Sequence, residues 1–214
     1  MNIRNFLFCF LAVLMGGCVL SLHPLYTDKS TVFEEKLLGS WVNSNNKDEI
    51  WRFEKTKNAE NVYKLTNTLD GKSGEFTAHL LKIDNTLFLD MFPEASLLDK
   101  QRTNDYYKIH LLPVHSFIKI EHITPKLGIR IIDQDKIDKM LQKDPNLIKH
   151  EIVDSHIVLT APTRQLEQFI GKYSAGADLF GDVTEMERLP SEPNNTAVKT
   201  ADPNRPPDGK KAGK

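Results

Sequence analysis

The sequence predicts a mainly β protein, an antiparallel barrel or sandwich with two helices in its C-terminal half. Three observations lead to this prediction. Many short runs alternate apolar and polar side chains, which is the two-residue period of a strand with one buried face. Turn-forming residues separate these runs about every 8–12 residues, as in sandwiches and barrels. Two later segments instead have the apolar spacing of a helix that is buried on one side.

The predicted strands lie between residues 37 and 160. The first contains Trp41, and in the next Trp51 and Phe53 alternate with charged residues. Asp84-Asn85 and residues 124–126 (Thr-Pro-Lys) have the composition of tight turns between neighbouring strands. The remaining predicted strands are residues 62–68, 76–83, 86–92, 106–112, 117–123, 127–132 and 157–160.

Two predicted helices interrupt the later strands. Asp133 is a suitable N-cap for residues 134–143, and Pro145 follows the end of that segment. Pro162 suits the first turn of the second helix, and Gly171 suits its end. The apolar faces consist of Ile137, Met140 and Leu141 in the first helix and of Leu166, Phe169 and Ile170 in the second.

The N-terminus has the layout of a secretory signal. Arg4 precedes an apolar run over residues 6–15, and two glycines lead directly into Cys18. The run is too short for a membrane-spanning helix, which needs about 20 residues. Two other interpretations stay open, namely an ordinary cleaved signal in which the cysteine occurs by chance, and a buried helix of the fold.

Residues 14–18 (Leu-Met-Gly-Gly-Cys) resemble the end of a bacterial lipoprotein signal. This resemblance implies that the chain is cut before Cys18 and that the thiol is acylated, which attaches the protein to a membrane of the cell envelope. Stable attachment requires more than one acyl chain. Val19 follows the cysteine where an Asp would imply the inner membrane, so the resemblance implies the periplasmic face of the outer membrane.

These features divide the chain into four segments. They are a signal peptide (1–17), a lipidated N-terminus and tether (18–35), one β-rich domain (36–190) and a disordered tail rich in proline and lysine (191–214). The tail has almost no large apolar residue and cannot bury enough surface to offset the entropy of ordering. The tether has several large apolar side chains, which either cover an open edge of the sheet or form a patch for a partner. These side chains are Leu22, Leu25, Tyr26 and Phe33.

Composition and cysteine content limit the possible partners. Charged residues make up 27 % of the chain and the formal net charge is -1, so no charge excess points to nucleic acid or to an anionic surface. Of the 2 cysteines, Cys9 leaves with the signal and Cys18 is expected to be lipidated. The mature domain therefore has no disulfide, and packing alone must stabilise it.

Three short segments resemble the lipocalin-type (calycin) barrels. Residues 37–41 (Leu-Leu-Gly-Ser-Trp) are similar to the G-x-W element of the first strand, and residues 103–107 (Thr-Asn-Asp-Tyr-Tyr) to the second element near a later turn. Residues 158–163 are similar to the last barrel strand leading into a flanking helix. The resemblance implies a closed barrel with Trp41 plugging one end. The alternative is that Trp41 is a core aromatic residue of another β fold.

The third element of the family is an arginine on the last strand, packed over the tryptophan. The predicted last strand, residues 157–160, has no arginine before Arg164, and Arg130 lies one strand earlier. Residues 21–27 and 38–42 also resemble a group of small uncharacterised bacterial lipoproteins, which implies a location but no activity.

The predicted function is a non-catalytic binder of a small apolar ligand or lipid, held inside the barrel. The same side chains can equally fill a solid interior. The alternative function is an accessory or structural lipoprotein that binds another envelope protein. The inward-facing candidates for a ligand wall are Trp41, Phe53, Tyr63, Phe76, Leu87, Tyr107, Ile109 and Ile118.

The sequence contains no motif of a catalytic or cofactor site. It has no G-x-S-x-G elbow, no phosphate-binding P-loop and no G-x-G-x-x-G after a strand. The spacing of its 7 histidines matches no zinc template, and we expect strand histidines such as His115 and His122 to face solvent. We therefore predict no enzyme activity, no cofactor and no metal site.

Overall fold

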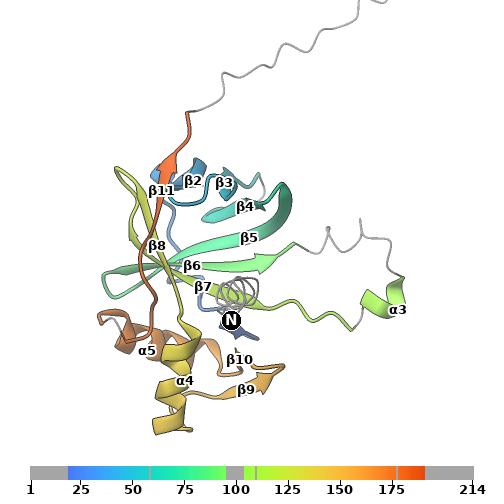
Figure 1. Ribbon diagram of the computed structural model, residues 1–214, viewed down its shortest axis with the longest axis vertical. Coiled ribbons are helices and arrows are strands. Elements are labelled where there is room, and N and C mark those ends of the chain that lie inside the picture. The colour runs from blue at the N-terminus through green and yellow to red at the C-terminus, as the bar shows by residue number, and fades with distance from the viewer. Residues whose placement is uncertain (1–18, 58, 95–103, 109, 177, 191–214) are drawn as a thin grey trace, which may run out of the picture.

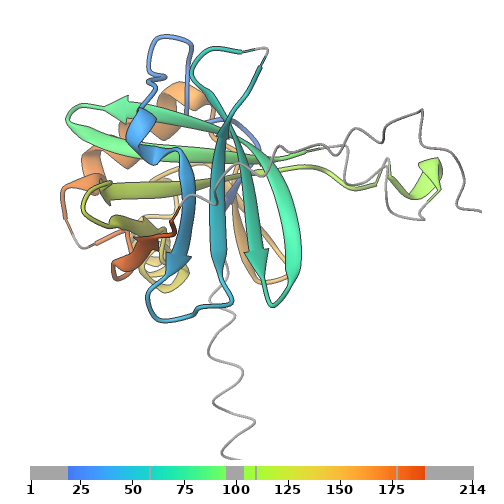
Figure 2. The same ribbon diagram turned by 90° about the horizontal axis from the view of Figure 1, so that it is seen from above.

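The computed structural model describes residues 19–190, apart from positions 58, 95–103, 109 and 177. Within these residues, eight antiparallel strands close into a barrel (Figure 1 and Figure 2). The predicted mainly β fold class is confirmed, and the choice between sandwich and barrel falls on the barrel. Cys18, the signal segment before it and the tail 191–214 lie outside the described residues.

The last described strand closes the barrel. Strand β11 (Thr184–Arg188) pairs with β2 (Gly39–Asn43) on one side and with β8 (Leu127–Ile131) on the other. The β6 strand (Thr86–Pro93) pairs with β7 (His115–His122), which pairs in turn with β8. The remaining barrel strands are β3 (Ile50–Lys55), β4 (Val62–Leu69) and β5 (Lys72–Ile83).

A small side sheet branches from the barrel at the start of β7. The short strand β1 (Leu20–Ser21) pairs antiparallel with the first residues of β7 and parallel with β10 (His156–Leu159). On the far side of β10, strand β9 (His150–Val153) pairs antiparallel and forms the edge. The N-terminal segment therefore joins the barrel to the side sheet.

The helices α4 (Gln134–Lys143) and α5 (Thr163–Ser174), together with the side-sheet hairpin, lie between β8 and β11 in the sequence and below the barrel in Figure 1. Asp133 caps α4, because its carboxylate accepts the backbone N–H of Lys136 at 3.1 Å. Two shorter helices, η2 (Glu35–Leu37) and α3 (Asp105–Lys108), lie in the connections. Both the N-cap and the bounds of α4 agree with the sequence prediction.

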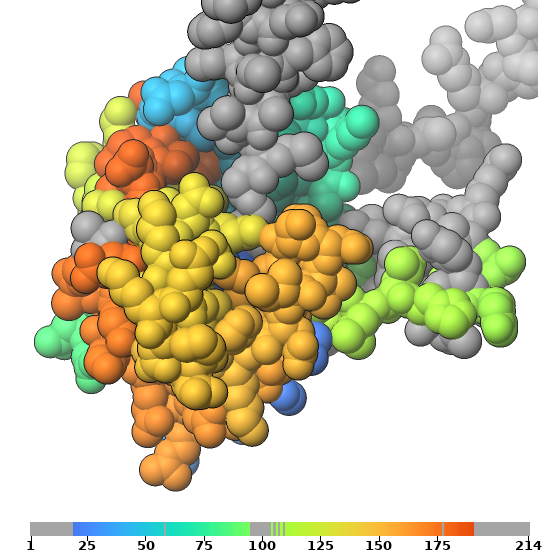
Figure 3. All heavy atoms as spheres, turned by 60° about the horizontal axis from the view of Figure 1, so that its bottom comes forward, coloured from blue at the N-terminus to red at the C-terminus, as the bar shows by residue number. Residues whose placement is uncertain are grey.

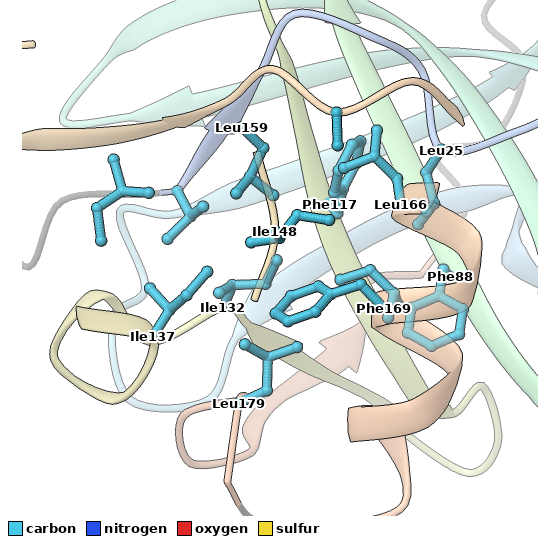
Figure 4. Close-up of a cluster of buried hydrophobic side chains, with 14 of the residues drawn as sticks. Leu25, Phe88, Phe117, Ile132, Ile137, Ile148, Leu159, Leu166, Phe169 and Leu179 are labelled. Atoms are coloured by element: carbon cyan, nitrogen blue, oxygen red, sulfur yellow. The ribbon is translucent and has the colours of Figure 1, made fainter. Parts of the chain in front are cut away.

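Two separate hydrophobic cores result from the alternation of the strands. Leu89 of β6 points into the barrel, whereas its neighbour Phe88 points outward into the core below the barrel. Figure 4 shows this second core between the helices and the outer face of the sheet. Leu25 is fully buried in it, so the first described segment, residues 19–26, packs on the barrel; we call this segment the strap.

Three local predictions were wrong. The predicted strand 106–112 instead begins with α3, and its side chains leave the sheet, since Tyr106 is 75 % and Leu112 71 % exposed. Residues 157–160 do form a strand, β10, but it belongs to the side sheet, and β11 is the last barrel strand. Helix α5 continues beyond Gly171. A Cβ atom at position 171 would lie 3.0 Å from Ile83 Cγ2. That glycine allows close packing of the helix against β5 and does not end it.

Candidate functional site

Trp41 lies at one end of the barrel and is fully buried. Its indole N–H donates to the Leu37 carbonyl at 2.9 Å, which ties strand β2 to the preceding turn. The guanidinium carbon of Arg188 lies 4.1 Å from the centre of the Trp41 ring, close enough for a cation–π interaction. This is the arginine that the resemblance to calycin barrels implies, and it lies on β11, a strand that the sequence analysis missed.

The same arginine closes the barrel end through the backbone. One of its nitrogens donates to the Leu38 carbonyl at 2.6 Å, and the other donates to the Lys36 carbonyl. Gly39 has a φ of +113°, and a Cβ there would lie 2.8 Å from an Arg188 nitrogen. Only glycine allows both this backbone conformation and the close approach of the guanidinium group.

The barrel interior brings together six of the eight predicted ligand-wall residues. Trp41, Phe53, Tyr63 and Ile118 are buried in one cluster, and Phe76 and Leu87 pack against it half-buried. Ile109 and the side chain of Tyr107 lie outside the described residues. The interior cluster also contains fully buried residues that the sequence analysis did not name, namely Leu65, Ala78, Leu80, Leu89, Leu127 and Met186. These side chains fill the barrel around the predicted wall.

Tyr63 has a polar end that is satisfied at the barrel rim. Its hydroxyl donates to the Glu34 carbonyl at 3.1 Å and accepts the Glu34 N–H at 2.6 Å. Burial raises the pKa of Tyr63 to about 12, so the hydroxyl keeps its proton. Phe33 stacks on the Tyr63 ring with the centroids 4.8 Å apart. The segment before β2 therefore covers this part of the interior.

A buried carboxylate on the outer face of the barrel holds the strap. Asp90 is fully buried; one of its oxygens accepts the backbone N–H of Leu25 at 2.6 Å, and the other lies 2.7 Å from His115 Nδ1. His115 is only 8 % exposed, so the expectation that it faces solvent was wrong. It is buried because the strap and Phe92 cover it, the Phe92 ring lying 4.5 Å from the imidazole.

A second histidine lies beneath the strap. His79 of β5 stacks on Tyr26 with a centroid distance of 3.8 Å and an interplanar angle of 15°. Burial lowers the pKa of His79 from its ordinary value of 6.5; the nearby carboxylate of Asp90 opposes this shift, whereas His115 adds to it. The Nδ1 atom of His79 is buried without a hydrogen-bond partner. The half-buried position of the imidazole therefore favours its neutral form.

Ser21, His115 and Asp90 combine the residue types of a hydrolytic triad. Ser21 lies opposite His115 in the pairing of β1 with β7. The serine is fully buried, and its hydroxyl donates to the His23 carbonyl at 2.8 Å. A nucleophile must reach a substrate and hand its proton to the histidine. In this geometry the three residues hold the strap.

A shallow groove of about 570 Å³ lies beside α4 and the end of α5. Its apolar part consists of Met140, Leu147 and Tyr173. Three lysines and two aspartates surround it, namely Lys136, Lys139, Lys143, Asp144 and Asp178. The groove therefore presents an apolar patch with charges of both signs around it.

Across the described part of the chain, no group of three or more His, Cys, Asp or Glu side chains is arranged to hold a metal ion. None of the described helices is long and apolar enough to cross a membrane. Comparison with known proteins gives no match to a family model, to a curated protein or to a solved structure.

We expect Asp90→Asn to lower the free energy of unfolding by about 2–3 kcal/mol, because an uncharged amide replaces the carboxylate and weakens its buried hydrogen bonds to Leu25 and His115. Urea unfolding of the variant measures this loss. Tryptic cleavage after Lys29, next to the strap, should also become faster. Asp84→Asn is the matched control, since Asp84 is exposed at a turn with a φ of +53°, which asparagine tolerates. Equal stability of the two variants would contradict the role of Asp90.

The half-buried His79 predicts a pH dependence of stability. The native state resists protonation of His79, whereas the unfolded chain takes up this proton near pH 6.5, so the free energy of unfolding should fall as the pH drops below that value. His79→Gln removes this contribution and should reduce the loss of stability between about pH 8 and about pH 5. Urea unfolding at both pH values tests it, with His23→Gln, an exposed histidine of the strap, as control. An unchanged pH dependence in His79→Gln would refute this assignment.

Proposed function

We propose that the protein is a lipid-anchored protein of the cell envelope whose domain binds a partner, another envelope protein, through its outer surface. Its attachment is an acylated Cys18, on the periplasmic face of the outer membrane. The observation that carries the choice of an outer binding surface is the filled barrel. Trp41, Tyr63 and Leu80 have no exposed surface, and the cluster around them occupies the interior.

The start of the fold supports the proposed anchor. Val19, the residue after Cys18, is buried, and β1 begins at Leu20. A cut directly before the cysteine would leave the strap, the side sheet and the barrel as described. The apolar run and the small pair before Cys18 provide the recognition sequence that such a cut requires.

The outer surface offers the features that a protein partner requires. The groove beside α4 combines apolar and charged side chains. Grooves of this kind are places where other chains bind to a folded domain. The Ser21, His115 and Asp90 group supports a non-catalytic domain, because its hydroxyl is buried and engaged within the strap.

A second candidate function is the carriage of a small apolar ligand or lipid inside the barrel. One specific observation favours it: the Arg188 and Trp41 pair closes one barrel end as the resemblance to calycin barrels implies. Half-buried apolar side chains line the interior next to the packed cluster, among them Phe33, Phe76 and Leu87. Ligand entry would require these side chains to move apart.

We expect Cys18→Ala to shift the protein from the membrane fraction to a precursor of higher mass, because the acyl chains are the proposed attachment and the cut depends on the cysteine. Mass spectrometry and membrane fractionation measure both effects. Cys9→Ala is the matched control, since it changes the other cysteine of the chain and should leave acylation intact. Membrane attachment that survives in Cys18→Ala would exclude the lipid anchor.

Extraction of bound lipids separates the two candidate functions. A domain produced without residues 1–18 should yield no stoichiometric lipid on solvent extraction and mass spectrometry, because the packed interior leaves little room for one. Cross-linking of the full acylated protein in intact cells should capture a defined envelope protein. Stoichiometric recovery of one lipid species would favour the carrier and count against the surface binder.

A further inference from the structure

Two large aliphatic side chains are exposed at consecutive positions of the edge strand of the side sheet. Ile152 is 64 % exposed and Val153 is 54 % exposed, both on β9. Neighbouring residues of a strand point to opposite faces, so the end of β9 is apolar on both sides. Burial of both side chains would remove this apolar area from water, and it requires a medium that surrounds the end of the strand on both faces.

The strand register places this apolar end beside the point where the chain enters the fold. Strand β1 runs parallel to β10, with Leu20 opposite Val158. β1 lies beside the second half of β10, and because the two strands run in the same direction, Val19 lies on the side of Leu20 toward the start of β10. Val153 lies opposite His156, the first residue of β10, so it also lies at this end. Val19 precedes β1 directly, and Cys18 precedes Val19 in the sequence.

The hairpin that presents these residues has a fixed position. Its two-residue turn has φ values of +48° at Asp154 and +67° at Ser155, the pattern of a tight turn whose twist matches the strands. The Ser155 carbonyl accepts a hydrogen bond from the side chain of Gln134, at the start of α4, at 2.7 Å. Figure 3 shows the hairpin beside α4 on this face of the molecule.

We propose that the turn end of the β9–β10 hairpin rests in the surface of the bilayer that holds the lipid anchor, with Ile152 and Val153 at the boundary between head groups and acyl chains. This inference rests on the proposed acylation of Cys18. No spacer separates that residue from the folded strap, so the lipid holds this end of the side sheet at the membrane. Tethering raises the effective concentration of the hairpin at the surface and makes a small apolar contact sufficient.

The charges near the turn indicate an apolar contact rather than an electrostatic one. Glu151 and Asp154 are exposed acidic residues next to the two aliphatic side chains. Anionic head groups would repel them, so the contact should persist at high salt and in vesicles without anionic lipid. This behaviour distinguishes insertion of the hairpin from attraction by the lysines beside the α4 groove.

The cysteine content allows a direct test on the acylated, full-length mature protein. With Cys9 removed and Cys18 acylated, Val153→Cys would provide the one free thiol of the chain, which can be labelled with an environment-sensitive NBD group. The labelled protein is reconstituted into vesicles of phosphatidylethanolamine with a minor share of phosphatidylglycerol. We expect a blue shift of the label and its quenching by lipids that carry a quencher near the head group.

Leu69→Cys is the matched control, because Leu69 is 44 % exposed and ends β4, a barrel strand that Figure 1 shows away from β9 and β10. Its label should stay unquenched. Ile152→Glu, added to the Val153→Cys protein, should abolish the quenching while the protein still sediments with the vesicles. The inference would be overturned if the label at position 153 were quenched no more than the label at position 69, in protein that sediments and has the mass of the acylated form. That result would still support the lipid anchor. Protein that stays in solution with an unmodified Cys18 would overturn both proposals.

Discussion

One buried carboxylate connects the N-terminal segment to the rest of the molecule. Asp90 accepts from the backbone of Leu25 and pairs with His115, so three segments far apart in the sequence meet at one side chain. A charge without exposure to water is costly unless its hydrogen-bonding capacity is used. The positions of the strap, of β6 and of the start of β7 therefore depend on one another. Val19, the first described residue, is therefore already part of the packed structure.

The segment inserted between β8 and β11 gives this barrel its particular form. It contributes both long helices and the side-sheet hairpin, and it buries a second core against the outer face of the barrel. That core contains Leu25 of the strap and Phe88 of β6, so the outer layer and the N-terminus stabilise each other. The interior of the barrel and the outer layer are thus separate sources of stability.

The sequence predicted the elements whose pattern is local. Alternation located most of the barrel strands, and Asp133 with its apolar face gave the bounds of α4. Strand β11 was missed because Met186 is its single buried apolar residue and charged residues flank it. The predicted strand at 106–112 was wrong because alternating residues form a strand only where a neighbouring strand is available to pair with them. Whether β11 and residues 106–112 are strands therefore depends on their packing partners, which a single sequence does not reveal.

The same limit explains what was missed at the candidate site. Five interior residues were identified from their strand period, since an inward face follows directly from alternation, and Trp41 was identified from the resemblance to calycin barrels. Asp90 lies within the apolar run 87–91, and a lone acid there was the available signal for a buried pair. Its contacts with Leu25 and His115 form only because the strap packs against β6 and β7. The local sequence pattern does not indicate this long-range packing.

The pairing of β2 with β11 also has a consequence for the order of folding. These two strands are neighbours in space, yet one lies near the beginning of the described chain and the other near its end. Most of the described chain must therefore be available before the ring of hydrogen bonds is complete. Contacts of such large sequence separation slow folding, because loop closure has to precede the stabilisation it allows. A newly made chain consequently cannot close its barrel until β11, the last described strand, is available.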